Sequence, residues 1–150
     1  MPRSRIRYEK TDAYEILVDS DQAIFETYKD LFLLAASVGY ARNRSDEDPS
    51  RPDEIPWDVL QSNQKNSVVA AALAYAATED PDSLTDENIQ IDLLEKYAAE
   101  GIDIIEAQVI DRPGDPLDNM IEFLRRNRDE DSEESRRNIL EEIEREFQEY

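Results

Sequence analysis

Carboxylates are the only abundant side chains in this sequence that are suited to catalysis. Five of them gather in a proline-rich segment, and carboxylate oxygens are ligands that Mg²⁺ and Ca²⁺ accept. These five are Asp46, Glu47, Asp48, Asp53 and Glu54. The segment lacks the regularly spaced Asp, Asn and Gly residues of a calcium-binding loop. We therefore interpret it as a solvated acidic loop, and we expect neither a bound metal nor a cofactor.

A second acidic group surrounds the expected start of a helix and consists of Asp80, Asp82, Asp86 and Glu87. Side-chain oxygens accept hydrogen bonds from the unpaired N–H groups at a helix N-terminus, and negative charge is favourable there. We therefore assign this group to helix capping, with Thr85 as the expected N-cap residue. Thr27, followed three residues later by Asp30, predicts a capping box for an earlier helix.

Missing residue types exclude several classes of enzyme. The sequence has no His and no Cys, which removes Ser-His-Asp chemistry, thiol nucleophiles and thiolate zinc sites. The three Gly residues are far apart, so they cannot form a glycine-rich phosphate loop. We predict that the protein is not an enzyme. A metal-dependent nuclease that uses the acidic loop is the one enzymatic alternative.

The first ten residues form the only clearly cationic stretch of the chain. The sequence has 17 Lys and Arg against 37 Asp and Glu, a net charge of -20, yet this stretch carries Arg3, Arg5, Arg7 and Lys10 against Glu9 alone. Such side chains suit phosphate groups, so we predict that they contact nucleic acid or a partner protein. Trp57 is a candidate anchor for a partner, although we favour a place for it in the core.

The remaining composition bears on the source and location of the protein. Few Lys, many Asp and Glu, and no Cys are typical of proteins from salt-accumulating halophiles, and we prefer this interpretation to mimicry of nucleic acid. The sequence has no run of about 18 apolar residues that would span a membrane. Its first ten residues contain no apolar stretch of a signal peptide. We therefore expect a soluble, cytoplasmic protein that does not contact a membrane.

Hydrophobic periodicity predicts a mainly α-helical fold of about five to six helices with a short N-terminal β-strand. Residues 2–9 alternate in the way a half-buried strand does. Helices are expected over residues 12–18, 28–40, 67–77, 86 to about 105, 116–124 (with Pro116 at the first helical position) and 133–147. The helix over 67–77 is apolar nearly all round, so we expect it at the centre of the core. Gly39 is expected to cap a helix, and Gly101 to kink or divide one.

The domain organisation is expected to be simple. Residues 1–127 form a single helical domain, which includes the basic arm over residues 1–10 and the acidic, proline-rich loop over residues 43–56. Residues 128–150 form an acidic C-terminal helix extension, in which a polar link over Asn127–Ser132 leads into a helix over about Glu133–Phe147. Its narrow apolar stripe either docks on the domain or pairs with a helix of a partner.

An arginine-bearing strand followed by two helices is also the layout of ribbon-helix-helix DNA-binding proteins. In those proteins two strands pair in a dimer and enter the major groove. Arg3, Arg5 and Arg7 would then face bases or phosphates. A dimeric DNA-binding transcriptional regulator of this type is therefore the alternative functional prediction.

Four segments are informative in combination, namely Ile24–Asp30, Ala35–Tyr40, Glu95–Gly101 and Pro113–Leu117. Their order and spacing resemble the Dnd system-associated protein 4 family, or DNA phosphorothioation-associated protein 4, over about residues 5–125. The resemblance implies that the protein accompanies enzymes that replace a non-bridging phosphate oxygen of DNA with sulfur and restrict unmodified DNA. We therefore predict a non-catalytic accessory or regulatory protein of such an antiviral system. Dnd modification or restriction proteins are the expected partners, with DNA and a second copy of the chain as further candidates.

Overall fold

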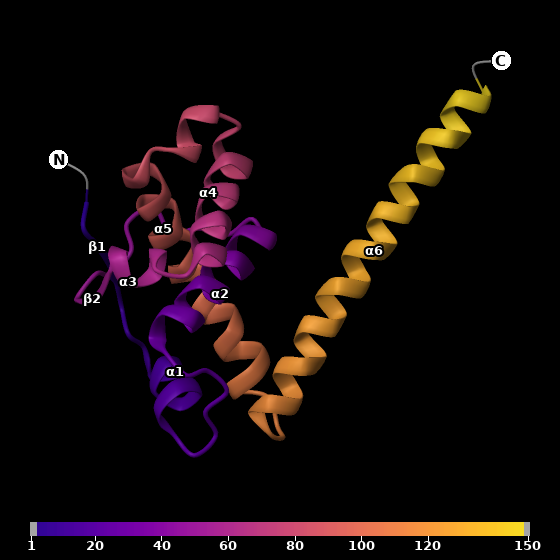
Figure 1. The fold of residues 1–150 in the computed structure, drawn as a ribbon. Coiled ribbons are helices and arrows are strands. Elements are labelled where there is room, and N and C mark those ends of the chain that lie inside the picture. Colours follow the sequence, from indigo (N-terminus) through magenta and orange to yellow (C-terminus); the bar gives the residue numbers. More distant parts are fainter. Residues whose placement is uncertain (1–2, 149–150) are drawn as a thin grey trace.

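The computed structural model describes residues 3–148, apart from the side chains of residues 129–135, 138, 147 and 148. The predicted fold class is confirmed, because the chain is mainly helical with a small two-stranded sheet near its N-terminus (Figure 1). The elements follow in the order β1 (Arg5–Tyr8), α1 (Asp12–Tyr14), η1 (Glu15–Asp19), α2 (Tyr28–Ala41), β2 (Asp53–Pro56), α3 (Trp57–Gln61), α4 (Gln64–Thr78), η2 (Pro81–Leu84), α5 (Glu87–Ile105), η3 (Glu106–Ile110) and α6 (Pro116–Gln148).

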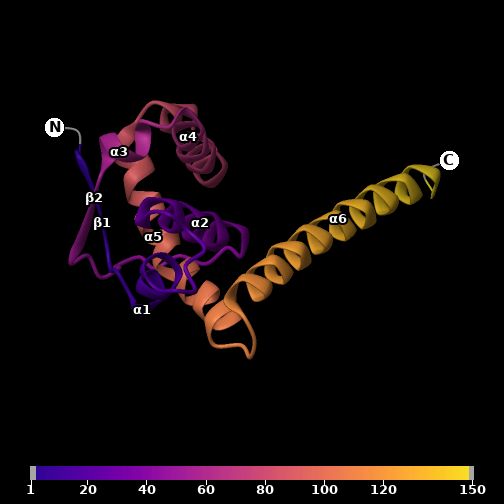
Figure 2. The ribbon, with the colours of Figure 1, turned by 60° about the horizontal axis from the view of Figure 1, so that its bottom comes forward.

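Helices α2 and α5 form the centre of the body, where they cross in close contact (Figure 2). A Cβ atom at Gly101 would overlap the backbone carbonyl of Ala35, and one at Gly39 would overlap the carbonyl of Tyr97. Both glycines therefore allow the two backbones to touch. Gly39 does not cap α2, which continues to Ala41, and Gly101 does not divide α5, which is one continuous helix, so both of these expectations were wrong.

The two strands pair within the chain. β1 and β2 are antiparallel, with Arg5 opposite Pro56 and Tyr8 opposite Asp53. Along β1 the side chains alternate between exposed and buried, which confirms the predicted half-buried strand. Tyr8 packs edge-on against Phe32, with ring centroids 5.5 Å apart. Burial, and to a smaller extent the charge of Asp53, raises the pKa of Tyr8 to about 12.

Helix α4 lies at the edge of the body, so its expected central position was wrong. Only Ala70, Leu73 and Ala74 are buried, whereas Val68 is 62% exposed and Tyr75 is also exposed. The side chains of α4 are mostly small, and only one face of the helix packs against the rest of the body. An apolar composition on all sides therefore did not imply burial on all sides.

Helix starts follow the expected chemistry, with one shift in position. Thr27 accepts a hydrogen bond from the N–H of Asp30, which confirms it as the N-cap of α2, and its hydroxyl donates one to the Asp30 carboxylate in place of the reciprocal backbone bond of a capping box. Asp86, not Thr85, is the N-cap of α5, and its carboxylate accepts hydrogen bonds from the N–H groups of Asn88 and Ile89. The carboxylate lies one residue closer to the unpaired N–H groups, which explains why it replaces the threonine.

Helix α6 begins at Pro116, as predicted, and is then continuous to Gln148. The expected polar link over Asn127–Ser132 was wrong, since residues 117–148 contain no Gly or Pro and are rich in the helix formers Arg and Glu. Met120 and Phe123 are buried against the body, while the rest of the helix extends away from it (Figures 1 and 2). No helix in the described part of the chain is both long and apolar enough to cross a membrane.

Candidate nucleic-acid or partner interface

Arg3 does not point away from the protein but is held by a buried carboxylate on α5. Its guanidinium lies 2.7 Å from Oε2 of Glu95, whose side chain is completely buried. The same oxygen accepts a hydrogen bond from the backbone N–H of Arg7 at 2.6 Å, and Nε of Arg51 lies 3.6 Å from Oε1. A buried carboxylate needs such partners to offset its loss of hydration. Glu95 thus fixes β1 on α5.

Arg5 and Arg7 lie on the outer face of β1. Their side chains are 54% and 58% exposed, and both guanidinium groups form ion pairs with Glu54 on β2, at 3.1 and 3.7 Å. Exposed ion pairs of this kind contribute little to stability, because water solvates the separated charges almost as well. Either arginine can therefore exchange Glu54 for an anionic group of a ligand without a large loss of stability.

Lys10 follows the strand and is also held by the body. Its ammonium group lies 4.9 Å from the ring centroid of Tyr28, and its backbone N–H donates to Asp53 at 2.8 Å. The hydroxyl of Tyr28 donates a hydrogen bond to the carboxylate of Asp19. That hydrogen bond raises the pKa of Tyr28, and the nearby charge of Lys10 opposes the rise.

Trp57 is a core residue, in agreement with the interpretation that we favoured over a partner anchor. It is 2% exposed and begins α3, directly after the β2 strand. Its backbone N–H donates to the carbonyl of Ser4, which extends the contact between the two strands. A partner cannot reach the indole ring without opening this part of the core.

The layout of a ribbon-helix-helix protein is absent from the described residues. One edge of β1 pairs with β2 of the same chain, not with a second copy. Along the other edge, the N–H of Arg3 donates to Asn88 and the N–H of Arg7 donates to Glu95. Both edges are therefore in use, and a second β1 has no free edge on which to pair. This overturns the alternative prediction in the form that required strand pairing.

The prediction that segment 43–56 is a loop throughout was wrong, because Asp53–Pro56 pair with β1 as strand β2. The acidic residues of the segment are tied to neighbouring groups. Glu47 lies 3.4 Å from the ammonium group of Lys96, while Glu54 pairs with the arginines of β1. The backbone N–H of Asp46 donates to the carbonyl of Lys96. Among the described residues, no group of three or more acidic, His or Cys side chains is arranged to hold a metal ion. Asp80 and Asp86 likewise accept capping hydrogen bonds, as the sequence indicated.

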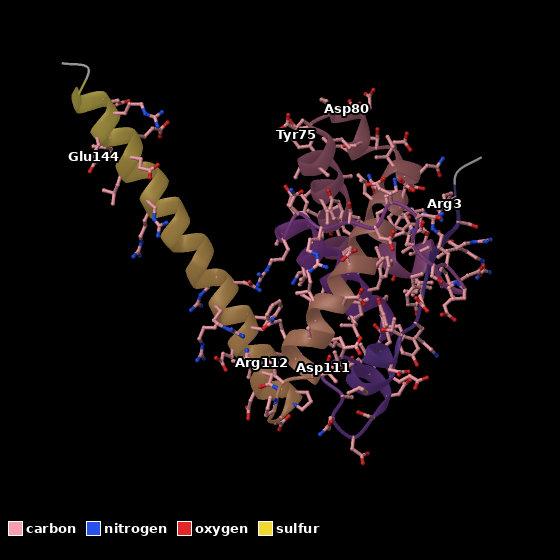
Figure 3. All side chains as sticks on the ribbon, turned by 180° about the vertical axis from the view of Figure 1, so that it is seen from behind. Arg3, Tyr75, Asp80, Asp111, Arg112 and Glu144 are labelled. Atoms are coloured by element: carbon pink, nitrogen blue, oxygen red, sulfur yellow. The ribbon has the colours of Figure 1, made fainter. Side chains whose placement is uncertain are left out.

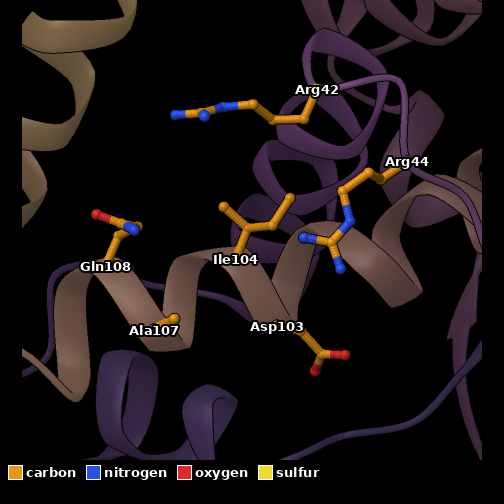
Figure 4. Close-up of a pocket in the computed structure, with 6 residues that line it drawn as sticks. All are labelled: Arg42, Arg44, Asp103, Ile104, Ala107 and Gln108. Atoms are coloured by element: carbon orange, nitrogen blue, oxygen red, sulfur yellow. The ribbon is translucent and has the colours of Figure 1, made fainter.

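A groove of about 510 Å³ lies beside the end of α2 and was not predicted from the sequence. Its lining residues are Arg42, Arg44, Asp103, Ile104, Ala107 and Gln108. Figure 4 shows Arg42 extending across the groove and Arg44 pointing down toward α5. Two arginines in a polar loop were visible in the sequence. No periodicity, however, indicated that they meet side chains about 60 positions further along the chain.

Both arginines of this groove already have partners. A guanidinium nitrogen of Arg42 lies 2.7 Å from the amide oxygen of Asn127 on α6, and one of Arg44 lies 2.7 Å from a carboxylate oxygen of Glu100. Burial raises the pKa of Asp103, as does the charge of Glu100, whereas Arg44 lowers it. The groove therefore contains charges of both signs, and its arginines position α6 and the loop after α2.

These features describe a small, mainly helical protein whose cationic N-terminal arm is anchored on its own body. The chain belongs to the family of DNA sulphur modification system-associated protein 4, whose family model matches residues 3–143. The match confirms the family indicated by the four sequence segments. It also reaches beyond residue 125, so most of α6 lies within the family region. No curated protein and no solved structure shows a significant match to the chain.

Proposed function

We propose that this protein is a non-catalytic accessory or regulatory component of a DNA phosphorothioation modification and restriction system. The family match over residues 3–143 is the observation that carries the proposal, because it associates the chain with a DNA sulphur modification system. The role is exerted through contacts with the proteins of the system or with its DNA. The absence of His and Cys from the sequence supports a role in binding more than a role in acid–base or nucleophilic catalysis.

The outer face of β1 is the proposed contact surface. Arg5 and Arg7 project from it with more than half of each side chain exposed, and their ion pairs with Glu54 are accessible to solvent. Arg3 supports this surface from the other side, because its pairing with Glu95 fixes the strand. Lys10 extends the same cationic stretch. A phosphate or carboxylate group of the partner would replace Glu54 as the counterion of the two arginines.

The DNA part of the proposal is tested by fluorescence anisotropy with matched plain and phosphorothioated duplexes. The full chain is titrated across a salt range in which circular dichroism confirms folding. Arg5→Gln and Arg7→Gln, each made alone, are expected to weaken binding and to reduce the slope of log K against log salt by about 1. Arg44→Gln is the matched control, since Arg44 is equally exposed, at 56%, and also forms one ion pair. It should leave binding unchanged.

The protein part is tested with the purified modification and restriction proteins of the same system, each titrated separately against the full chain. Binding that is lost with the Arg5 and Arg7 replacements, but not with Arg44→Gln, would assign the surface to that protein. A folded chain that binds neither duplex and none of these proteins would overturn the proposal. Equal losses with the control would show that net charge, not the β1 surface, is responsible.

A further inference from the structure

Helix α6 carries two apolar clusters that nothing in the described part of the chain covers. The proximal cluster consists of Leu117, Ile121 and Leu124, and the distal cluster of Ile139, Leu140 and Ile143. All six side chains are between 45 and 60% exposed. Figure 3 shows Glu144, beside the distal cluster, far from the body and on the opposite side of the molecule from Arg3. In globular proteins a helix gains most of its stability from packing of an apolar face, so a partner for α6 is expected.

Four of these six side chains are arranged symmetrically along the helix, whereas Leu124 and Leu140 have no apolar, exposed counterpart. Leu117 and Ile143 lie 13 residues before and after Glu130, and Ile121 and Ile139 lie nine residues before and after it. At 3.6 residues per turn, these four residues and Leu124 fall within an arc of about 100° on the helix surface. A two-fold axis near Glu130 would therefore bring the proximal cluster of one helix onto the distal cluster of another. An isologous dimer requires this reciprocal pairing.

We propose that two copies of this chain pair through α6 in an antiparallel arrangement, with the two-fold axis near Glu130. Ile121 of each copy would pack against Ile139 of the other, and Leu117 against Ile143. The pairing buries apolar side chains that are exposed in the single chain, which is the main favourable contribution to association of this kind. The proposal goes beyond the contacts of the β1 surface and does not depend on them.

The charges of the sequence favour the antiparallel orientation. Arg125, Arg126 and Arg128 come just before the midpoint of the helix, and the five acidic residues of segment 129–134 come just after it. In the antiparallel pair segment 125–128, with its three Arg residues, lies level along the axis with segment 132–135 of the other copy, which carries Glu133 and Glu134, while segment 129–131 lies level with its own copy. In a parallel pair the same segments would face their own copies and repel each other.

The antiparallel orientation also separates the two acidic bodies. In this register Pro116 of one copy lies opposite Glu144 of the other, and the two Pro116 residues are therefore about 40 Å apart at 1.5 Å per residue. This separation is several times the Debye length of about 8 Å at physiological ionic strength. Repulsion between the two acidic bodies is thus largely screened, while the charges on the paired helices themselves stay close together. A parallel pair would place the bodies side by side.

The first test is the mass in solution, measured by sedimentation equilibrium of the full chain over a range of concentrations. A monomer has a mass of 17.4 kDa, and the proposal requires a concentration-dependent approach to twice this value. Because each contact occurs twice in the dimer, Ile121→Gln and Ile139→Gln should each raise the dissociation constant at least tenfold, roughly the effect of 1.4 kcal/mol. Val68→Gln is the matched control on α4 and should leave the dissociation constant unchanged.

The second test fixes the orientation by disulfide cross-linking. The natural sequence has no Cys, so Ile121→Cys and Ile139→Cys each introduce a single thiol. Each variant is oxidised alone and after mixing with the other. Only the mixture should give a cross-linked dimer, because a disulfide requires Cα atoms about 4.4–6.8 Å apart, and identical positions are about 27 Å apart in the antiparallel pair. In a parallel pair, each variant would cross-link with itself.

Three results would overturn the proposal. A mass of one chain at all concentrations, in protein whose helix content is intact, would exclude the dimer. The two clusters on α6 would then be a contact surface for a different protein. A dimer that survives both Gln replacements unchanged would place the interface elsewhere. Cross-linking of each variant with itself would show a parallel pair.

Discussion

Helices α4 and α5 contrast in composition and in burial. α4 is built almost entirely of small and apolar residues in its second half, yet it lies at the edge of the body and exposes Val68 and Tyr75. α5 carries charged residues along its length, yet it crosses α2 at the centre and buries Glu95 and Gly101. Mean apolar content therefore does not decide which helix is central. Close backbone approach and a buried carboxylate paired with Arg3 accompany the central position here.

The largest expected effect comes from the α2–α5 crossing. In Gly101→Ala the new methyl group would overlap the carbonyl of Ala35. Backbone atoms cannot move aside as a flexible side chain can, so the helices must separate. We expect a loss of about 3 kcal/mol or more in the free energy of unfolding, which is at the upper end for overpacking. Urea denaturation followed by circular dichroism measures it.

The control for this replacement is the opposite change on α4. Ala76→Gly, at an exposed position, should cost only about 1 kcal/mol, because glycine lowers helix propensity without any change in packing. If Gly101→Ala is no more destabilising than this control, then α2 and α5 are not in backbone contact at the crossing.

The next effect in size concerns the carboxylate of Glu95. Glu95→Ala leaves the N–H of Arg7 without its acceptor and removes the counterion of Arg3. Loss of a buried ion pair typically costs 3–5 kcal/mol. We expect about 2–3 kcal/mol here, because both Arg3 and Arg51 are about one third exposed and can be hydrated.

Glu54→Ala provides the comparison for Glu95→Ala. Glu54 also pairs with two arginines, but its side chain is 39% exposed, and such pairs contribute at most about 1 kcal/mol. We expect a change below about 0.5 kcal/mol in the free energy of unfolding. Equal effects of the two replacements, measured in the same urea titration, would show that β1 is not anchored through Glu95.

Local signals in the sequence predicted the elements well. An alternating strand, a helix cap at Thr27 and the start of a helix at Pro116 depend on neighbouring residues. The structure has the strand over Arg5–Tyr8, the cap at Thr27 and the helix that begins at Pro116. The position of α4 and the role of Gly101 depend on which helix faces which. Both are properties of the tertiary fold. Hydrophobic periodicity in one sequence indicates which residues form a helix, but it does not indicate which helices pack together.

At the candidate site, too, local features were predicted from the sequence and long-range contacts were not. The sequence identified the cationic arm, and the structure places Arg5 and Arg7 on an outer face. It could not reveal that Glu95, about 90 positions away, neutralises Arg3. Nor could it reveal the groove beside Arg42 and Arg44, whose opposite wall comes from α5 and η3. Long-range ion pairs leave no pattern in one sequence, because the partner of each charge is chosen by the fold.

The smallest expected effect is on the outer face of α4. Val68→Gln should change the free energy of unfolding by no more than about 0.5 kcal/mol, since an exposed side chain loses little on replacement. Leu73→Gln, five residues further along on the buried face, should cost about 2–4 kcal/mol through lost packing and burial of an amide. Two nearly equal losses would mean that the outer face of α4 is covered in solution. α4 would then be as central as its composition suggests, and its contrast with α5 would disappear.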